Sequence, residues 1–286
     1  MQSGWIDFCI RRLKMLKFLL KGILNMEYPR QELRPQVLKF EQELFDKNQE
    51  SLNCFISWKD TKLTRTHAKE YKNFIKLNKD VRFWFFDDNS QDKWMGANYQ
   101  SHPIYKIYQG VRFPASKSDI FRLCLLYEYG GIYTGINRVF DGSLRELYSG
   151  ADKFLISFEK NSFVRKTASN IIPAEFRNLN VVQHTLFAPA RHGILRMAME
   201  AIVSHAPNYN KVVFPSVKEA IWKFSAPYLL THVVDNYLDQ FGMKNVAFSG
   251  IQYNQTCRIP RGAEFRYATS PSYLGSENRQ ILDYER

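Results

Sequence analysis

The chain lacks any long apolar run. No stretch of its 286 residues approaches the roughly 20 consecutive apolar residues that a membrane-spanning helix needs. It also has no internal repeat and no low-complexity tract, while 45% of its residues are hydrophobic and 15% are aromatic. Such a composition argues against disorder and for a folded protein with a sizeable core.

Cysteine is scarce as well. The four cysteines lie far apart, show no metal-ligand spacing, and in two cases fall inside apolar runs: Cys9, Cys54, Cys124 and Cys257. This usage predicts reduced core thiols in a cytosolic compartment. The histidines show no metal-binding spacing either, and no Ser or Cys nucleophile pattern supports a hydrolase.

Acidic residues are outnumbered. The formal net charge is +12, so the surface carries a positive field that favours phosphates, whether in nucleotides, anionic lipids, nucleic acid or acidic polysaccharide. Nucleic-acid binding would need aromatic residues interleaved with basic ones on an exposed sheet, a pattern that is absent. The aromatic run Phe83 to Phe86 instead fits a strand buried on both sides.

The N-terminal segment Trp5 to Leu24 is predicted to form a basic amphipathic helix. Its apolar residues share a broad side at helical spacing, and only Asp7 opposes the basic residues Arg11, Arg12, Lys14, Lys17 and Lys21. Such a helix can lie on an anionic membrane surface, pack on its own domain or pack on a sister chain. Charges that continue through the apolar positions exclude a secretory signal.

Strand and helix patterns alternate after this region. Apolar runs at 52–58 and 81–86 flank a helical pattern at 64–77, which predicts a mainly parallel sheet flanked by helices. Ligands gather at the carboxyl ends of such strands. We therefore expect an N-terminal helix and connecting arm over 1–50, an α/β domain over 51–250 and a C-terminal tail or closing loop over 251–286. Further strands are expected at 154–158 and 181–188, and helices at 193–205, 216–224 and 227–241.

The centre of the chain is the most informative part. Pro114 and Ser116 announce a helix that ends at Gly130 and Gly131, and a strand follows over 132–137. Asp119 and Arg122 project from one face of this helix, with Ser118 beside them. They are either an ordinary solvated acid–base pair or, because the next strand returns beside the helix, two charges at the rim of a site.

The run Ala115 to Phe140, with its order S-D-x-x-R, L-Y-x-x-G-G-I-Y and a three-residue site, resembles the DXD glycosyltransferases of the sugar-binding-region family. That family includes yeast-type initiating mannosyltransferases, bacterial capsular transferases and the glucosyltransferase domains of large clostridial toxins. The resemblance implies a GT-A fold and transfer from a UDP- or GDP-sugar, generally with retention at the anomeric carbon. It also implies a saccharide or lipid-linked acceptor, as in polysaccharide biosynthesis.

The resemblance also implies roles for individual residues. Trp58 matches an aromatic residue that stacks on the nucleobase, and Asn89 matches a loop that contacts the nucleotide or sugar. Ser118 is matched to the ribose, while Asp119 and Arg122 are matched to sugar hydroxyls and phosphate-proximal oxygens. His184 falls on the acceptor side.

The metal site of the family is altered in this chain. Gly135 and Asn137 occupy the positions of its two carboxylates, which bind Mn²⁺ or Mg²⁺ and the diphosphate. Glycine offers no ligand and asparagine only a neutral one. Ser276 and Glu277, in a segment similar to the family's closing loop, could supply further oxygens.

Three explanations for the altered site stay open. The positions were changed to trap a substrate, the protein is a non-catalytic sugar-nucleotide- or partner-binding relative, or another cation replaces the metal. Arg138 is adjacent, although strand alternation turns it away from Gly135 and Asn137 unless the backbone turns there. The overall prediction is a cytoplasmic glycosyltransferase that can lie on the inner membrane surface. Its donor, acceptor and oligomeric state are left open.

Overall fold

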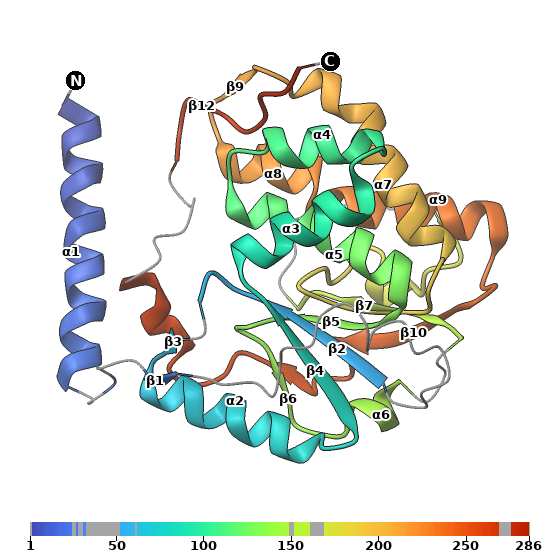
Figure 1. The fold of residues 1–286 in the computed structure, drawn as a ribbon, viewed down its shortest axis with the longest axis horizontal. Coiled ribbons are helices and arrows are strands. Elements are labelled where there is room, and N and C mark those ends of the chain that lie inside the picture. The colour runs from blue at the N-terminus through green and yellow to red at the C-terminus, as the bar shows by residue number, and fades with distance from the viewer. Residues whose placement is uncertain are drawn as a thin grey trace.

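A four-stranded sheet forms the centre of the molecule (Figure 1). The computed structural model describes residues 2–24, 27, 31–32, 52–60, 62–148, 152–160, 169–268 and 276–285. The strand order is β4 (Val81–Phe86), β2 (Leu52–Ser57), β5 (Gly131–Gly135) and β8 (Thr185–Ala188). The first three are parallel and β8 is antiparallel to β5. The predicted α/β class with a mainly parallel sheet is confirmed.

Both faces of the sheet are buried. Along β2 and β4, side chains alternate between two core clusters, so that Phe55 and Trp84 face one way while Ile56 and Phe85 face the other. This explains the near-continuous apolar runs and confirms that Phe83 to Phe86 fills a two-sided strand.

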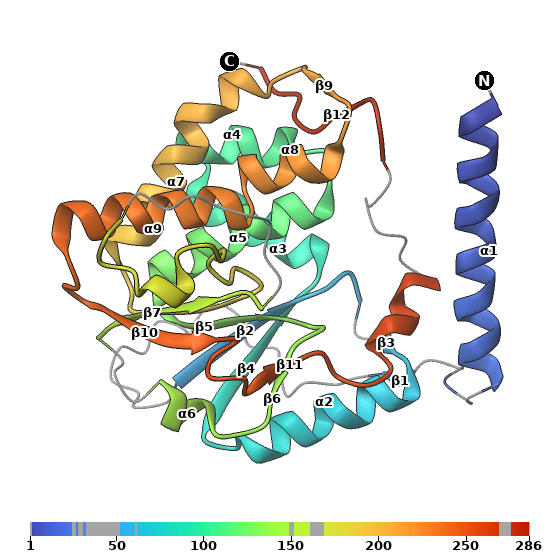
Figure 2. The same cartoon turned by 180° about the vertical axis from the view of Figure 1, so that it is seen from behind.

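Helices cover the two faces unequally (Figures 1 and 2). α2 (Arg65–Leu77) and the short α6 (Leu144–Leu147) lie on one side. The other side carries six helices, namely α3 (Asp88–Tyr99), α4 (Pro103–Gly110), α5 (Pro114–Tyr129), α7 (Gly193–His205), α8 (Val217–Phe224) and α9 (Pro227–Phe241). The helices expected near residues 64, 116, 193, 216 and 227 are confirmed within two residues.

Smaller strand pairs complete the described chain. β7 (Phe154–Phe158) and β10 (Val246–Ile251) are parallel and extend past β8. The pairs β6 (Val139–Phe140) with β11 (Cys257–Arg258), β9 (Val213–Phe214) with β12 (Arg279–Gln280), and β1 (Gln31–Glu32) with β3 (Lys62–Leu63) are antiparallel. Single 3₁₀ turns lie at Ala174–Phe176, Ala206–Asn208 and η3, Ala263–Ala268. The strand predicted over 181–188 is shorter and begins at Thr185, while Val181 forms an isolated bridge with Phe158.

The turn between α5 and β5 requires its two glycines. Gly130 and Gly131 both have positive φ, 62° and 95°, and the Gly130 N–H caps the helix on the Leu126 carbonyl. A Cβ at Gly131 would lie 2.6 Å from the Asn53 carbonyl oxygen of β2. The glycines therefore set the angle at which β5 enters the sheet.

Three of the described helices, α3, α4 and the short α6, were not expected from the sequence. The residues after β4 were interpreted as a loop, but Asp87 is the N-cap of α3 and its carboxylate accepts from the Ser90 N–H at 2.8 Å. His102 and Pro103 begin α4 in the same way, with proline in the first turn. The expected core thiols are present at Cys54, Cys124 and Cys257, which are free and buried.

The N-terminal helix α1 (Gln2–Leu24) stands beside the rest of the molecule (Figures 1 and 2). It contacts η3, and Glu27 just beyond it binds the start of α2, where the Thr66 N–H donates to its carboxylate at 2.7 Å. Within the described ranges, no helix is both long and apolar enough to cross a membrane. Most of the expected connecting arm, residues 33–50, lies outside the described residues, and the boundaries at 50 and 251 stay predictions.

The C-terminal segment packs against α4 and β9. Ile281 and Leu282 are buried, and the Ile281 and Leu282 carbonyls accept from the backbone N–H groups of Arg112 and Lys211.

We predict that Leu282→Ala lowers the free energy of unfolding by about 2–5 kcal/mol, because it leaves a cavity in the core. Ile259→Ala, at a side chain that is 55% exposed, is the control and should change stability by about 0.5 kcal/mol or less. Equal losses in chemical denaturation would show that this segment is not part of the core.

Candidate active site

Polar residues converge at one edge of the central sheet. Ser57 pairs in register with Phe86 on one side and with Gly135 on the other, so the carboxyl ends of β2, β4 and β5 coincide. His184 precedes the antiparallel strand β8, and its carbonyl accepts from the Gly135 N–H at 2.9 Å. This is the edge at which ligands of parallel sheets bind.

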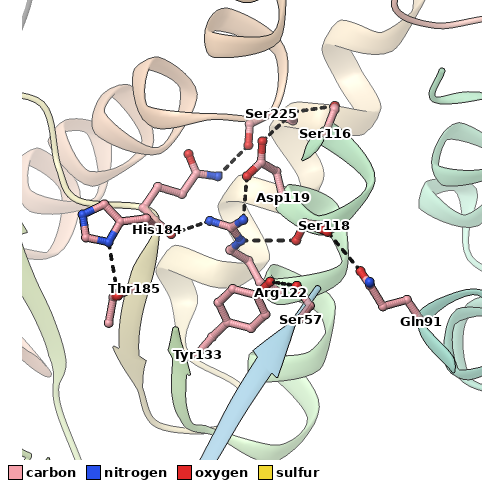
Figure 3. Close-up of polar contacts among 11 residues, drawn as sticks. Ser57, Gln91, Ser116, Ser118, Asp119, Arg122, Tyr133, His184, Thr185 and Ser225 are labelled. Atoms are coloured by element: carbon pink, nitrogen blue, oxygen red, sulfur yellow. Dashed lines mark hydrogen bonds and ion pairs between the residues drawn. The ribbon is translucent and has the colours of Figure 1, made fainter. Parts of the chain in front are cut away.

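Asp119 and Arg122 form a buried ion pair on the face of α5 that looks toward this edge (Figure 3). The Arg122 Nη2 and Asp119 Oδ1 atoms are 2.9 Å apart. Arg122 also donates from Nε to the Ser118 carbonyl at 3.2 Å and from Nη1 to the Gln183 carbonyl at 2.6 Å. The pair is therefore not the solvated acid–base pair that was the alternative interpretation of the sequence.

The guanidinium also joins α5 to the sheet. Its carbon lies 4.7 Å from the centre of the Tyr133 ring in β5, a cation–π contact. The Tyr133 hydroxyl is hydrogen-bonded to Ser57 Oγ at the end of β2. The helix face and the strand that follows the paired glycines thus lie side by side, as the sequence predicted.

A second layer of hydrogen bonds supports the ion pair. Ser225, just after α8, donates to Asp119 Oδ2 at 3.5 Å and lies 2.7 Å from the Ser116 hydroxyl. The Gln183 side chain donates to the Ser225 carbonyl at 2.6 Å. Sequence reasoning missed Tyr133, Ser57, Gln183 and Ser225, because only the folded chain brings residues so far apart in sequence together.

Burial shifts the pKa values of Asp119 and His184 at this edge of the sheet. It raises the pKa of Asp119 to about 6, although the Arg122 charge and the Ser225 hydrogen bond oppose the rise, so the carboxyl is mainly ionised at neutral pH. The pKa of His184 is lowered by burial and then by the charges of Arg138 and Arg122. Its ring is therefore neutral, with Nδ1 3.2 Å from the Thr185 hydroxyl and Nε2 buried.

A tight turn follows β5. The Gly135 carbonyl accepts from the Arg138 N–H at 2.9 Å, so the strand ends at Gly135 instead of continuing to 137. Because the strand ends before Arg138, strand alternation does not turn the Arg138 side chain away from Gly135 and Asn137. The Arg138 Nη1 donates to the Asn137 carbonyl at 3.0 Å.

Glu159 is an acidic residue of this region that the sequence analysis missed. It follows β7, and its N–H donates to the Asn180 carbonyl at 2.8 Å. Burial raises its pKa to about 7, and the Arg138 charge opposes that rise. In the sequence, the signal for Glu159 is an acidic residue directly after the apolar run 154–158.

The remaining donor-side candidates are spread around the edge. Trp58 is half-buried and packs on the α2 side of the sheet, away from α5. Asn89 is exposed in the first turn of α3, so its expected position in a loop is wrong.

Ser118 is half-buried and donates to Gln91 Oε1 at 3.2 Å. Gln91 also lines a cavity of about 270 Å³ between α3, α4 and α5, together with Asp88, Asp92, Arg112 and Lys117.

Gly135 and Asn137 do not supply the carboxylates that a divalent cation needs at these positions. Gly135 has no side chain, Asn137 is neutral, and no cluster of three or more His, Cys, Asp or Glu residues that could hold a metal occurs in the described part of the chain. The Ser276 carbonyl accepts from Val217 at the start of α8, whereas Ser225 of the site follows its end. The roles of Ser276 and Glu277 as metal ligands stay predictions. Residues 273–275 lie outside the described chain.

A comparison with known protein families supports the resemblance that the central segment indicated. Residues 42–153 match the family described as a glycosyltransferase sugar-binding region containing a DXD motif. The match confirms, over these residues, the resemblance to the DXD glycosyltransferases that the central segment indicated. No curated protein sequence matches the chain.

Several solved structures are similar in fold. The PaToxG glycosyltransferase is 14% identical with a TM-score of 0.45, over 82% of this chain and 81% of its own. The UDP-bound glycosyltransferase domain of the YGT toxin is 11% identical with a TM-score of 0.36, over 68% of this chain and 60% of its own. The catalytic domain of Clostridium novyi alpha-toxin is 11% identical with a TM-score of 0.33, over 69% and 65%.

The buried ion pair predicts a large effect on stability. Arg122→Ala leaves Asp119 buried without its partner and should lower the free energy of unfolding by about 3–5 kcal/mol. The matched control is Arg196→Ala in α7, whose pair with Glu200 is more than half exposed and should contribute about 0.5 kcal/mol. Urea denaturation measures both, and similar losses for the two variants would contradict the burial of the Arg122 pair.

Proposed function

We propose that this protein transfers a sugar from a UDP- or GDP-sugar to a saccharide or lipid-linked acceptor, with retention at the anomeric carbon. The observation that carries the proposal is the contact of the Asp119–Arg122 face with the end of β5, inside the matched sugar-binding region. A ligand bound at this edge meets a guanidinium whose orientation is already fixed. Such preorganisation reduces the entropic cost of binding.

Each residue then has a role in donor binding. The remaining N–H groups of Arg122 bind phosphate-proximal oxygens, and Asp119 accepts from sugar hydroxyls while orienting Arg122. Ser118 binds the ribose, Trp58 stacks on the base, and Asn89 contacts the nucleotide from the start of α3. The turn at Gly135 to Asn137 lies beside the diphosphate, and His184, as a neutral imidazole, contacts the acceptor hydroxyl.

The competing function is a binding module that keeps the fold without transfer. Its support is the pair of neutral residues Gly135 and Asn137 at the positions of the metal-binding carboxylates. Both functions require that the chain bind a nucleotide-sugar. Turnover, measured with and without Mn²⁺, separates them.

The N-terminal helix suggests where the enzyme acts. The apolar side of α1 is open to solvent, with Leu13 65%, Leu16 49% and Leu20 50% exposed, and exposed lysines accompany it. We infer that α1 lies on an anionic membrane surface and holds the enzyme at the cytoplasmic face, near a membrane-bound acceptor. Apolar burial and lysine–lipid attraction together favour this orientation.

A thermal-shift screen of nucleotide-sugars tests the function. A donor at about 100 times its Kd should stabilise the folded state by about 2.7 kcal/mol and raise Tm by about 5 °C or more. Asp119→Asn should weaken donor binding at least about tenfold, because the buried carboxylate no longer orients Arg122. Arg196→Ala, outside the site, is the control. A screen in which no UDP- or GDP-sugar shifts Tm would refute the proposal.

The same screen has a pH signature. Because the pKa of Asp119 is raised to about 6, its charge is lost as pH falls through that value. Donor binding should therefore weaken below about pH 6 in the natural chain and lose this dependence in Asp119→Asn. If donor binding weakened over the same acidic pH range in the natural chain and in Asp119→Asn, the titrating group would be a residue other than Asp119.

Membrane contact is tested by vesicle sedimentation. Reversing Lys14, Lys17 and Lys21 to Glu should abolish binding to vesicles that contain phosphatidylserine, since each lysine near such a surface contributes about 1 kcal/mol. Reversal of the exposed Lys69, Lys72 and Lys76 on α2 makes the same change in net charge and should leave most of the binding. If both triple variants lost vesicle binding equally, the binding would depend on net charge alone and not on α1.

A further inference from the structure

The turn at residues 135–138 is held from two directions. Besides its own hydrogen bond between Gly135 and Arg138, the ring nitrogen Nε2 of His67 lies 2.9 Å from the Ile136 carbonyl oxygen. His67 is buried in α2, and β6 continues from the turn into its pairing with β11. The turn is thus a fixed part of the sheet edge.

Among the described residues, two acidic side chains of this region are already paired, Asp119 with Arg122 and Asp141 with Arg258. Burial raises the pKa of Glu159 to about 7, and the Arg138 charge opposes that rise. The side chains at 135 and 137 carry no charge. A divalent cation is normally held by carboxylates that offset its charge, and positions 135 and 137 supply none.

Positive charge, by contrast, is present on both sides of the strand end. Arg122 approaches from α5 through Tyr133 and the Gln183 carbonyl, while Arg138 is carried by the turn itself. Burial and then both of these charges lower the pKa of the His184 imidazole. A diphosphate at the end of β5 would therefore lie within reach of two guanidinium charges.

We propose that Arg138 takes the place of the divalent cation and neutralises the diphosphate of the donor, so that donor binding and transfer are independent of metal. The inference rests on the proposed glycosyltransferase function. In the reaction, the bond between the anomeric carbon and the phosphate oxygen breaks and its electron pair stays on the leaving diphosphate. The acceptor oxygen bonds to the anomeric carbon, and its proton passes to the diphosphate. The guanidinium stabilises the charge that develops on the leaving oxygen.

Calorimetric titration of the full chain with UDP and GDP, first in EDTA and then with Mn²⁺, tests this proposal. We expect one of the nucleotides to bind in EDTA, and Mn²⁺ to change its Kd by less than about twofold. Arg138→Ala should weaken binding by about ten- to a hundredfold, as the loss of a charge-assisted hydrogen bond does, and Arg138→Lys by less. Arg196→Ala is the control for a lost surface arginine, and melting temperatures report whether each variant folds.

The outcomes separate the inference from the function beneath it. Binding that requires Mn²⁺ would overturn the role of Arg138 and leave the proposed function standing. Absence of nucleotide binding in both buffers would overturn the two together. Unchanged affinity in Arg138→Ala and Arg138→Lys would assign the diphosphate to other residues.

A gain-of-metal variant gives an independent measurement. Gly135 does not have positive φ, and a Cβ there would meet only the Asn137 Oδ1 at 2.9 Å and the His184 carbonyl at 3.5 Å. The double variant Gly135→Asp/Asn137→Asp is therefore compatible with the backbone once the side chain at 137 rotates. It should bind the nucleotide at least about tenfold more weakly in EDTA and recover with Mn²⁺. Metal-independent binding in this variant would contradict the proposed exchange of charges.

Discussion

The buried pair of Asp119 and Arg122 is the interaction on which this sheet edge depends. Removing two charges from water is costly, and their mutual attraction repays it only when the other hydrogen-bonding groups are also satisfied. Here the Ser118 and Gln183 carbonyls and the Tyr133 ring complete the surroundings of the guanidinium. The pair consequently fixes how α5, β5 and the segment before β8 meet.

That arrangement explains why structural and functional roles fall on the same residues. A guanidinium that already donates to three acceptors cannot rotate, so its remaining donors keep one direction. A site built in this way does not have to order its own side chain when a ligand arrives. The same burial places the pKa of Asp119 near 6, close enough to neutrality for the pair to respond to acid.

The sequence predicted those parts of the molecule whose signals are local. Pro114 and the glycines at 130 and 131 mark the ends of α5, and apolar runs mark the strands, because each reflects a backbone preference. Asn89 was misplaced because the capping residue Asp87 was interpreted as part of a loop. Gln183 and Ser225 could not be found, since their relation to Asp119 exists only after α8 and β8 have packed against α5.

The altered metal positions are consistent with the charges around them. Aspartates at 135 and 137 would lie next to Arg138 and would compensate part of its charge, so a diphosphate would then need a cation to bind there. Neutral residues at both positions add no such carboxylate, which is the condition that the proposed role of Arg138 requires. Loss of the carboxylates and the presence of arginine in the turn thus act in the same direction. In its proposed role, Arg138 would bind the diphosphate without first having to bind a metal ion.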